Sequence, residues 1–295
     1  GWHDWYQSAN YLVDPESGEY PFAGIEPIGV PRALACTALP FAEGDLNGLH
    51  KLFKENKGEI AGIMMEPMRS NLPKEGYLES VKELAHENGA VLIFDEVSCG
   101  WRIALGGVQE YLGIIPDMTV VAKCMSNGYP MGAVVGSRKV MEPAGQMFVS
   151  SSYWSDNIGL AASIATISEL KRLDSASQFS TIGSGLKDAL KDAIRTVGIS
   201  ARCEGIWTNP SIVIDVPENS LRPKVNTLFI QEMARHGIFC STTFKASLAN
   251  TDEDIHLTAE AASKSLAVVM KGLEGNLDDL LDVQVGREPF RRLVR

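Results

Sequence analysis

Three ionisable residues each follow an apolar run of the sequence. Glu66 ends the run EIAGIMME, Asp95 follows AVLIF, and Lys123 follows TVVA. Apolar runs of this kind predict buried strands, and ligands of open α/β sheets bind outside the carboxyl ends of the strands. Any one of these residues alone would be an ordinary polar side chain that meets solvent at a strand end. Together they predict a shared crevice.

An acid and a lysine on successive strands are open to two interpretations. Asp95 and Lys123 could form an ion pair, which would have to offset the desolvation of both charges if buried. They could instead form a site for pyridoxal phosphate, in which the lysine amine makes a Schiff base with the cofactor aldehyde. The carboxylate would then keep the pyridine nitrogen protonated. The second interpretation explains both residues and why they must stand several ångströms apart.

The elements that must position these residues alternate along the chain. Apolar runs predict strands at 59–66, 90–97, 117–123 and 132–137, and the spacing at 77–88 predicts a helix. Strands that are apolar throughout, rather than alternating, indicate burial on both faces. We therefore predict an α/β fold whose mostly parallel sheet is flanked by helices.

The pattern changes after about residue 172. Apolar spacing predicts helices at 157–173, 179–198 and 223–237, and SIVIDV (211–216) predicts a strand. Thr251 precedes three acidic residues and is expected to cap a further helix.

The domain organisation follows from this change. We predict that residues 1–172 form part of a large α/β domain and that residues 173–295 form a smaller C-terminal α+β domain.

The composition excludes several classes of function. The chain of 295 residues has a net charge of −10 and 45% hydrophobic residues, so it should fold without the basic surface that nucleic acids require. It contains no apolar run of about 18 residues, so no membrane span is predicted. The five cysteines are odd in number and form no CxxC pair, which favours reduced thiols and a cytoplasmic protein. The five scattered histidines predict no metal site.

The central segment resembles a known enzyme family. Residues 92–136 read LIFDEVSCGWRIALGGVQEYLGIIPDMTVVAKCMSNGYPMGAVVG. This segment is similar to the class III, fold-type I pyridoxal-phosphate aminotransferases, and most similar to the glutamate-1-semialdehyde 2,1-aminomutase branch. The FDEV strand, the ALGGVQEYLGIIPD connector and the lysine before a GxPxG turn carry the resemblance. It continues through GIMMEPM (62–68), SSYWSDNIGLAAS (151–163) and TDEDI (251–255).

The resemblance implies a role for each matching residue. Lys123 corresponds to the Schiff-base lysine that also moves the proton, and Asp95 to the partner of the pyridine nitrogen. Val97 corresponds to the apolar residue on one face of the cofactor ring. Ser152 stands where a threonine binds the cofactor phosphate across a homodimer interface, and Glu66 corresponds to a glutamate on the substrate side. The resemblance thus implies pyridoxal 5'-phosphate and a homodimer whose site is shared between subunits.

Two departures from the family pattern concern the substrate. Lys245, in TTFKASLAN, stands where the semialdehyde aminomutases carry an acidic residue, so a different substrate is expected unless Lys245 points into solvent. Ser98 follows FDEV where Gln or Met is usual. The family's ring-stacking residues and phosphate-binding loop precede the position of Gly1, and we expect this sequence to be part of a longer protein.

The predicted function is transfer of an amino group between an amine or amino-acid donor and a carbonyl acceptor through a Schiff base on Lys123. One alternative is an intramolecular 2,1-aminomutase of the glutamate-1-semialdehyde type. Another is a non-catalytic protein or fragment with the aminotransferase fold. The presence of Lys123 and Asp95 argues against the last, because a protein without this activity has no physical need to keep a buried amine and a buried acid there.

Overall fold

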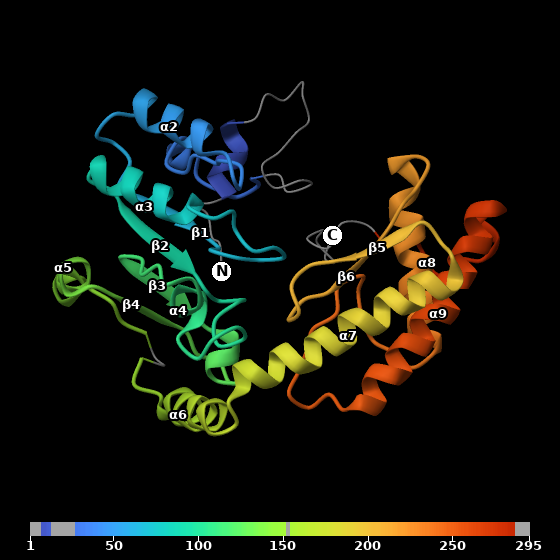
Figure 1. Cartoon of the computed structure of the whole chain (residues 1–295). Helices are drawn as coiled ribbons and strands as arrows, with labels where there is room; N and C mark the ends of the chain where they lie inside the picture. The colour runs from blue at the N-terminus through green and yellow to red at the C-terminus, as the bar shows by residue number, and fades with distance from the viewer. Residues whose placement is uncertain (1–6, 13–26, 152–153, 287–295) are drawn as a thin grey trace.

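A computed structural model describes residues 7–12, 27–151 and 154–286 of the chain (Figure 1). One region holds a four-stranded sheet with its helices, and a second region holds a two-stranded sheet packed on helices. The long helix α7 (Ser175–Val197) runs from beside the first region across the second (Figure 1).

The four-stranded sheet is mostly parallel. Its strands are β1 (Gly62–Met65), β2 (Val91–Asp95), β3 (Met118–Val121) and β4 (Ala133–Gly136), and they lie side by side in that order. β1, β2 and β3 pair in parallel, whereas β4 pairs antiparallel with β3. All four strands lie within the runs that the sequence predicts.

Helices cover this sheet because each presents an apolar face. These are α2 (Leu46–Glu55), α3 (Tyr77–Glu87) and α4 (Gly107–Leu112). α3 begins after Gly76, where φ is +76°, and its apolar positions recur at helical spacing. The core beneath α2 and α3 contains Leu49, Phe53, Ile63, Met65, Tyr77, Leu78, Val81, Leu84, Ala85, Ala90, Leu92, Phe94 and Ile114.

The expectation of burial on both faces is wrong for β4. Its central residues Val134 and Val135 are 46% and 52% exposed. β4 is the last strand of the sheet, and the connection of residues 122–132 returns it antiparallel beside β3. An apolar run identifies a strand but does not say whether a helix of the same chain covers it.

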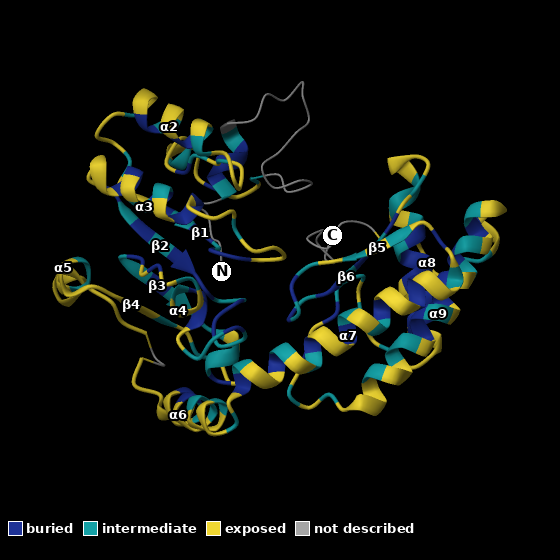
Figure 2. Cartoon of the chain, viewed as in Figure 1, coloured by how far each residue is buried: buried dark blue, intermediate teal, exposed yellow. Residues whose placement is uncertain are grey.

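The second region is built from later elements. They are β5 (Ala201–Glu204), β6 (Ser211–Ile214), α8 (Arg222–Arg235) and α9 (Asp252–Glu274). β5 and β6 form an antiparallel hairpin. Figure 2 shows that α7 and α9 turn exposed faces outward. Their buried residues contribute to the core of this region. That core includes Leu190, Ile212, Ile214, Val225, Leu228, Phe229, Met233, Ala262, Leu266 and Val269.

The remaining elements are short or peripheral. The α-helices are α5 (Arg138–Met141) and α6 (Asn157–Arg172). Turns of 3₁₀ helix span Ser8–Leu12, Arg32–Leu34, Lys123–Met125, Glu142–Gln146, Asn219–Leu221 and Leu277–Asp279. None of the helices in the described part of the chain combines the length and apolar character that a membrane crossing requires.

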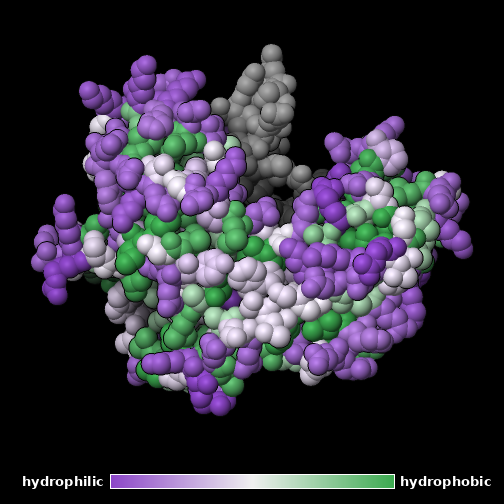
Figure 3. Space-filling view, viewed as in Figure 1, coloured by the Kyte–Doolittle hydropathy of each residue, from purple (hydrophilic) through white to green (hydrophobic). Residues whose placement is uncertain are grey.

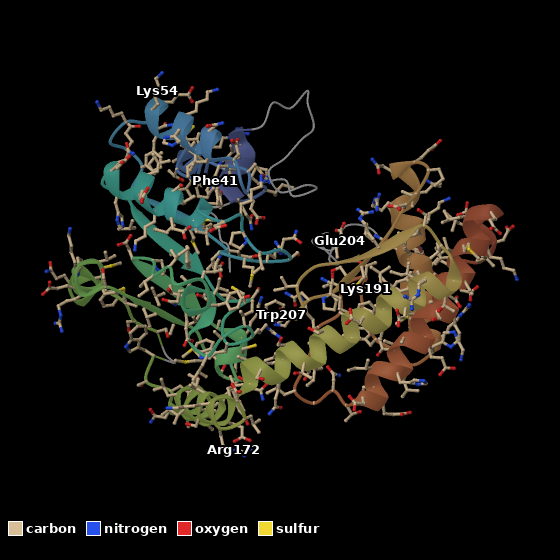
Figure 4. All side chains as sticks on the ribbon, in the orientation of Figure 1. Phe41, Lys54, Arg172, Lys191, Glu204 and Trp207 are labelled. Carbon is tan, nitrogen blue, oxygen red and sulfur yellow. The ribbon has the colours of Figure 1, made fainter. Side chains whose placement is uncertain are left out.

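A small apolar cluster joins the two regions. Ile206 and Trp207, from the connection between β5 and β6, pack with Met68 and with the segment Cys99–Val108. Trp207 lies between the two regions in Figure 4, and its ring makes an edge contact with Tyr111 at a centroid distance of 6.0 Å. The N–H of Ile206 also donates to the carbonyl of Ser70 at 2.8 Å. These contacts fix the hairpin beside the segment that follows β1.

Replacing Thr251 tests the predicted cap of α9. The Thr251 hydroxyl accepts a hydrogen bond from the N–H of Asp254 at 3.2 Å, and the Asp254 carboxylate accepts one from the N–H of Thr251 at 2.8 Å. We expect Thr251→Ala to lower the free energy of unfolding by about 1 kcal/mol, measured by urea denaturation. Thr251→Ser keeps the hydroxyl and serves as the control. Equal losses in both variants would contradict the capping role.

Candidate active site

The first three strands deliver one polar group each to the same edge of the sheet. β1 is followed by Glu66, β2 ends at Asp95, and β3 is followed two residues later by Lys123. In the parallel register Asp95 lies opposite Val120. Because the three strands run in the same direction, their carboxyl ends lie at one edge of the sheet, as the predicted shared crevice requires.

Asp95 is a buried carboxylate with one hydrogen-bonding position still open. Its residue surface is 5% exposed. The N–H of Val97 donates to Oδ1 at 3.0 Å. Oδ2 accepts no hydrogen bond from any residue that the structure describes. Since a buried carboxylate is costly without partners, Asp95 is suited to bind a cationic or N–H-bearing group.

Lys123 projects its ammonium from a strained turn. It opens a 3₁₀ turn with φ at +47°, a value that non-glycine residues seldom adopt. Its Nζ donates to the Ser98 hydroxyl at 2.7 Å. The expectation of a buried amine is wrong, because Lys123 is exposed although Asp95 is buried. The turn moves the lysine beyond the end of the strand, where the side chain meets solvent.

Glu66 responds to the charges of both neighbouring strand ends. Burial raises the pKa of Glu66, Arg69 opposes that shift, Asp95 adds to it, and Lys123 opposes it. A carboxylate oxygen of Glu66 lies 3.5 Å from Arg69. Because Asp95 and Lys123 both perturb Glu66, the three strand-end groups share one electrostatic environment.

Val97 and Ser152 occupy different positions with respect to this edge. Val97 follows β2 directly and is half-buried, and its backbone fixes Asp95. Ser152 lies outside the residues that the structure describes, so its predicted role remains a prediction.

Lys245 reaches the site from the second region. Its Nζ donates to Oδ1 of Asn209 at 2.9 Å, and Asn209 Nδ2 donates to the carbonyl of Arg69 at 3.3 Å. Lys245 retains solvent exposure, yet protein atoms crowd its ammonium. This desolvation lowers its pKa, and the nearby Arg102, Arg69 and Lys123 lower it further. The structure therefore brings Lys245 toward the strand-end groups.

A second buried carboxylate holds the turn that precedes α4. Glu96 Oε2 accepts the N–H of Val108 at 2.7 Å, and Oε1 accepts the N–H of Gln109 at 3.0 Å. Burial raises the pKa of Glu96, and these hydrogen bonds oppose the shift. A Cβ at Gly107, where φ is +83°, would lie 2.2 Å from Oε2, so the carboxylate requires glycine there. Gln109 also donates to the Thr119 hydroxyl at 3.2 Å, which links the turn to β3.

Sequence reasoning missed four residues of this site in whole or in part. Glu96 was visible as a second acid after an apolar strand, but no local pattern identifies the amides that it accepts. Ser98 was noted only as a departure from the family pattern. Arg102 donates Nε to the carbonyl of Ser98 at 3.0 Å, a contact consistent with their spacing of four. No local pattern identifies Arg69, because its carbonyl accepts a hydrogen bond from Asn209, which is 140 positions away in the sequence.

The donor set fits pyridoxal 5'-phosphate. Lys123 supplies a primary amine that an aldehyde can reach from solvent. Asp95 supplies a buried carboxylate whose Oδ2 is open among the described residues, as a protonated ring nitrogen requires. The two groups stand on adjacent parallel strands and form no ion pair with each other within the described ranges.

Comparison with known proteins identifies relatives across most of the chain. The pattern described as "Aminotransferase class-III" matches residues 40–266. A 3-aminobutyryl-CoA aminotransferase of Cloacimonas acidaminovorans (strain Evry) is 31% identical over 282 residues, covering 92% of this chain and 64% of that protein. A glutamate-1-semialdehyde 2,1-aminomutase of Alkaliphilus oremlandii (strain OhILAs) is 32% identical, covering 90% and 66%. The chain thus spans slightly less than two thirds of the length of these relatives.

Solved structures share the fold at lower identity. The FumI protein of Sphingopyxis sp. MTA144, in a PLP internal aldimine form, superposes with a TM-score of 0.77 at 24% identity, over 84% of this chain and 61% of that one. An omega-transaminase from Sphaerobacter thermophilus gives a TM-score of 0.77 at 22% identity, over 92% and 66%. The α/β fold with a mostly parallel sheet is therefore confirmed.

Removing the Glu96 carboxylate should destabilise the protein. Glu96→Ala leaves the amides of Val108 and Gln109 without their acceptor, and an unsatisfied buried group costs about 1–3 kcal/mol. Glu110→Ala is the matched control, because Glu110 also accepts an amide, that of Gly106, but is exposed to solvent. We expect the control to change the free energy of unfolding by less than about 0.5 kcal/mol. Similar urea midpoints for the two variants would contradict this role of Glu96.

Proposed function

The chain belongs to the class III aminotransferase family, and we propose that its protein is a pyridoxal 5'-phosphate enzyme that transfers an amino group from an amine or amino acid to a carbonyl acceptor. The observation that carries the proposal is the placement of Lys123 and Asp95 at the ends of adjacent parallel strands. When bound, the cofactor supplies an aldehyde that accepts the amino group and a ring that delocalises an electron pair.

Each residue of the chain has a distinct part in this reaction. Lys123 would hold the cofactor through its primary amine, and the same amine would move the proton of the substrate carbon. Ser98 orients the lysine, since its hydroxyl lies 2.7 Å from Nζ. Asp95 pairs with the ring nitrogen and keeps it protonated.

Three further residues complete the proposed site. Val97 packs on one face of the cofactor ring from the end of β2. Ser152 binds the cofactor phosphate of the neighbouring subunit. Glu66, whose pKa is influenced by the charges of Asp95 and Lys123, faces the substrate. These assignments extend the resemblance residue by residue to positions of this chain.

Intermolecular transfer is preferred over an aminomutase reaction. The curated relatives include proteins named for both activities. Lys245 is positively charged at a position where the resemblance to the semialdehyde aminomutases implies an acidic residue. A reversed charge beside a substrate site changes which substrate groups bind there. The difference therefore supports a substrate other than glutamate 1-semialdehyde.

The proposal includes the domain organisation of the enzyme and its cellular compartment. Residues 1–172 form part of the cofactor-binding domain, and residues 173–295 form the smaller domain. The five cysteines are all unpaired, which supports the cytoplasm as the compartment.

We further propose a homodimer formed through an apolar surface. This apolar surface consists of exposed hydrophobic side chains from β4 to α6, namely Val134, Val135, Met147, Phe148, Val149, Trp154, Ile158, Leu160 and Ile164. Figure 3 shows hydrophobic residues gathered over the part of the molecule where Figure 1 draws β4 and α6. An exposed apolar surface of this kind favours association, and in the sequence its residues flank Ser152, which the proposal gives to the site of the second subunit.

Lys123→Ala tests the catalytic proposal. The protein is mixed with pyridoxal phosphate, its visible spectrum is recorded, and it is reduced with borohydride before peptide mapping by mass spectrometry. We expect a phosphopyridoxyl group on Lys123 and loss of amino-group transfer in Lys123→Ala, with the unfolding midpoint unchanged because the side chain is exposed. Lys139→Ala, which removes an exposed lysine of α5, is the control.

The same experiment separates the proposed function from its alternatives. Transfer at the parent rate by Lys123→Ala, or an unlabelled Lys123 in folded protein, would refute the catalytic assignment and favour a non-catalytic protein. Product that retains the nitrogen of its own substrate molecule would favour an aminomutase.

A charge placed on the apolar surface should weaken the dimer. Phe148 is 97% exposed, and Phe148→Asp would bury a carboxylate in the interface. We expect sedimentation equilibrium to show at least about a tenfold increase in the dimer dissociation constant. Phe239→Asp is the matched control, because Phe239 is equally exposed but lies after α8. A monomeric parent protein, or equal effects of both variants, would refute this interface.

A further inference from the structure

Gln109, in the first turn of α4, is bonded to residues that flank Asp95. Its Nε2 donates to the Thr119 hydroxyl at 3.2 Å, and its backbone N–H donates to Oε1 of Glu96 at 3.0 Å. Thr119 pairs across the sheet with Phe94, which precedes Asp95. Glu96 follows Asp95 directly in the sequence. Gln109 therefore contacts the strand partner of one neighbour of Asp95 and the side chain of the other.

The side chains of Gln109, Thr119 and Glu96 form a polar cluster within the sheet region. Glu96 is 1% and Thr119 3% exposed, and Gln109 is half-buried. Polar groups that are removed from water depend on hydrogen bonds within the protein, and these bonds restrict where the groups can lie. Loss of the Gln109 amide would deprive the buried Thr119 hydroxyl of a donor.

Backbone hydrogen bonds connect this polar cluster to Asp95. The N–H of Glu96 donates to the carbonyl of Val120 at 2.9 Å, and the N–H of Gly100 donates to the carbonyl of Glu96 at 2.8 Å. Asp95 lies opposite Val120 in the parallel register. In the described part of the chain, the Asp95 carboxylate is held at Oδ1 alone, by the N–H of Val97 at 3.0 Å. The direction of its open Oδ2 therefore depends on how firmly the surrounding backbone is held.

We infer that Gln109 is a positioning residue for Asp95, and that it keeps the open carboxylate oxygen where the ring nitrogen of the cofactor binds. The inference rests on the proposed function, because it takes Asp95 as the partner of that nitrogen. A carboxylate binds a protonated nitrogen strongly only at hydrogen-bonding distance and direction. A small displacement of Asp95 would therefore weaken this one interaction more than the other contacts of the cofactor.

A matched pair of cofactors tests the positioning role. Pyridoxal phosphate and its deaza analogue, which carries C–H in place of the ring nitrogen, share the same aldehyde and phosphate. Dissociation constants of both are measured by spectrophotometric titration of the cofactor-free protein. We expect the parent protein to prefer pyridoxal phosphate, and we expect Gln109→Met to reduce this preference by at least about threefold. A purely structural loss would weaken the binding of both cofactors alike.

Substitutions of Thr119 provide a second test that does not depend on the folding of Gln109→Met. Thr119→Val removes the hydroxyl with little change in shape and should reduce the preference to a similar extent. Thr119→Ser retains the hydroxyl and should keep the preference of the parent protein. Gln178→Met, which removes an exposed glutamine side chain of α7, is the matched control.

Failure of the inference differs from failure of the proposed function. An unchanged preference in folded Gln109→Met and Thr119→Val would overturn the positioning role and leave the role of Asp95 intact. Equal losses in Thr119→Ser and Thr119→Val would also overturn it, because the hydroxyl would then have no part. A parent protein that binds both cofactors equally well would instead refute the pairing of Asp95 with the ring nitrogen, and the inference with it.

Discussion

The site depends on the parallel register of β1, β2 and β3. Because these strands run in one direction, their carboxyl ends meet at one edge of the sheet, and Glu66, Asp95 and Lys123 emerge there although they are far apart in sequence. The pairing of Asp95 with Val120 sets where the acid stands relative to the turn that carries the lysine. A slip of one residue would turn each side chain to the opposite face.

The buried Glu96 stabilises this arrangement at an energetic cost. Its carboxylate is removed from water, and the amides of Val108 and Gln109 offset the desolvation. In return, the turn before α4 is tied to the residue that follows Asp95, and Gln109 extends the tie to β3. Two adjacent acids therefore have different environments: Glu96 is satisfied within the chain, whereas Asp95 keeps one oxygen open among the described residues.

Local sequence patterns predicted the strands and helices, but they could not predict contacts between residues far apart in the sequence. The apolar runs located all four strands of the sheet, and Thr251 caps α9 as expected. The exposure of Lys123 could not be read from the sequence, because it depends on a left-handed turn at a lysine. Nor could the approach of Lys245, since it depends on a hydrogen bond between Asn209 and Arg69 across 140 positions. The direction of β4 likewise follows from the edge of the sheet rather than from its composition.

The separate origin of Lys245 has a consequence for how such a protein can evolve. The amine and acid of the strand ends belong to the sheet, whereas Lys245 lies in a loop of the second region that contacts the sheet region through Asn209 and the small cluster around Trp207. Substitutions in that loop can alter charge beside the strand ends without repacking the core beneath α2 and α3. The charge beside the strand ends can thus change among descendants while the strand-end groups Glu66, Asp95 and Lys123 are inherited intact.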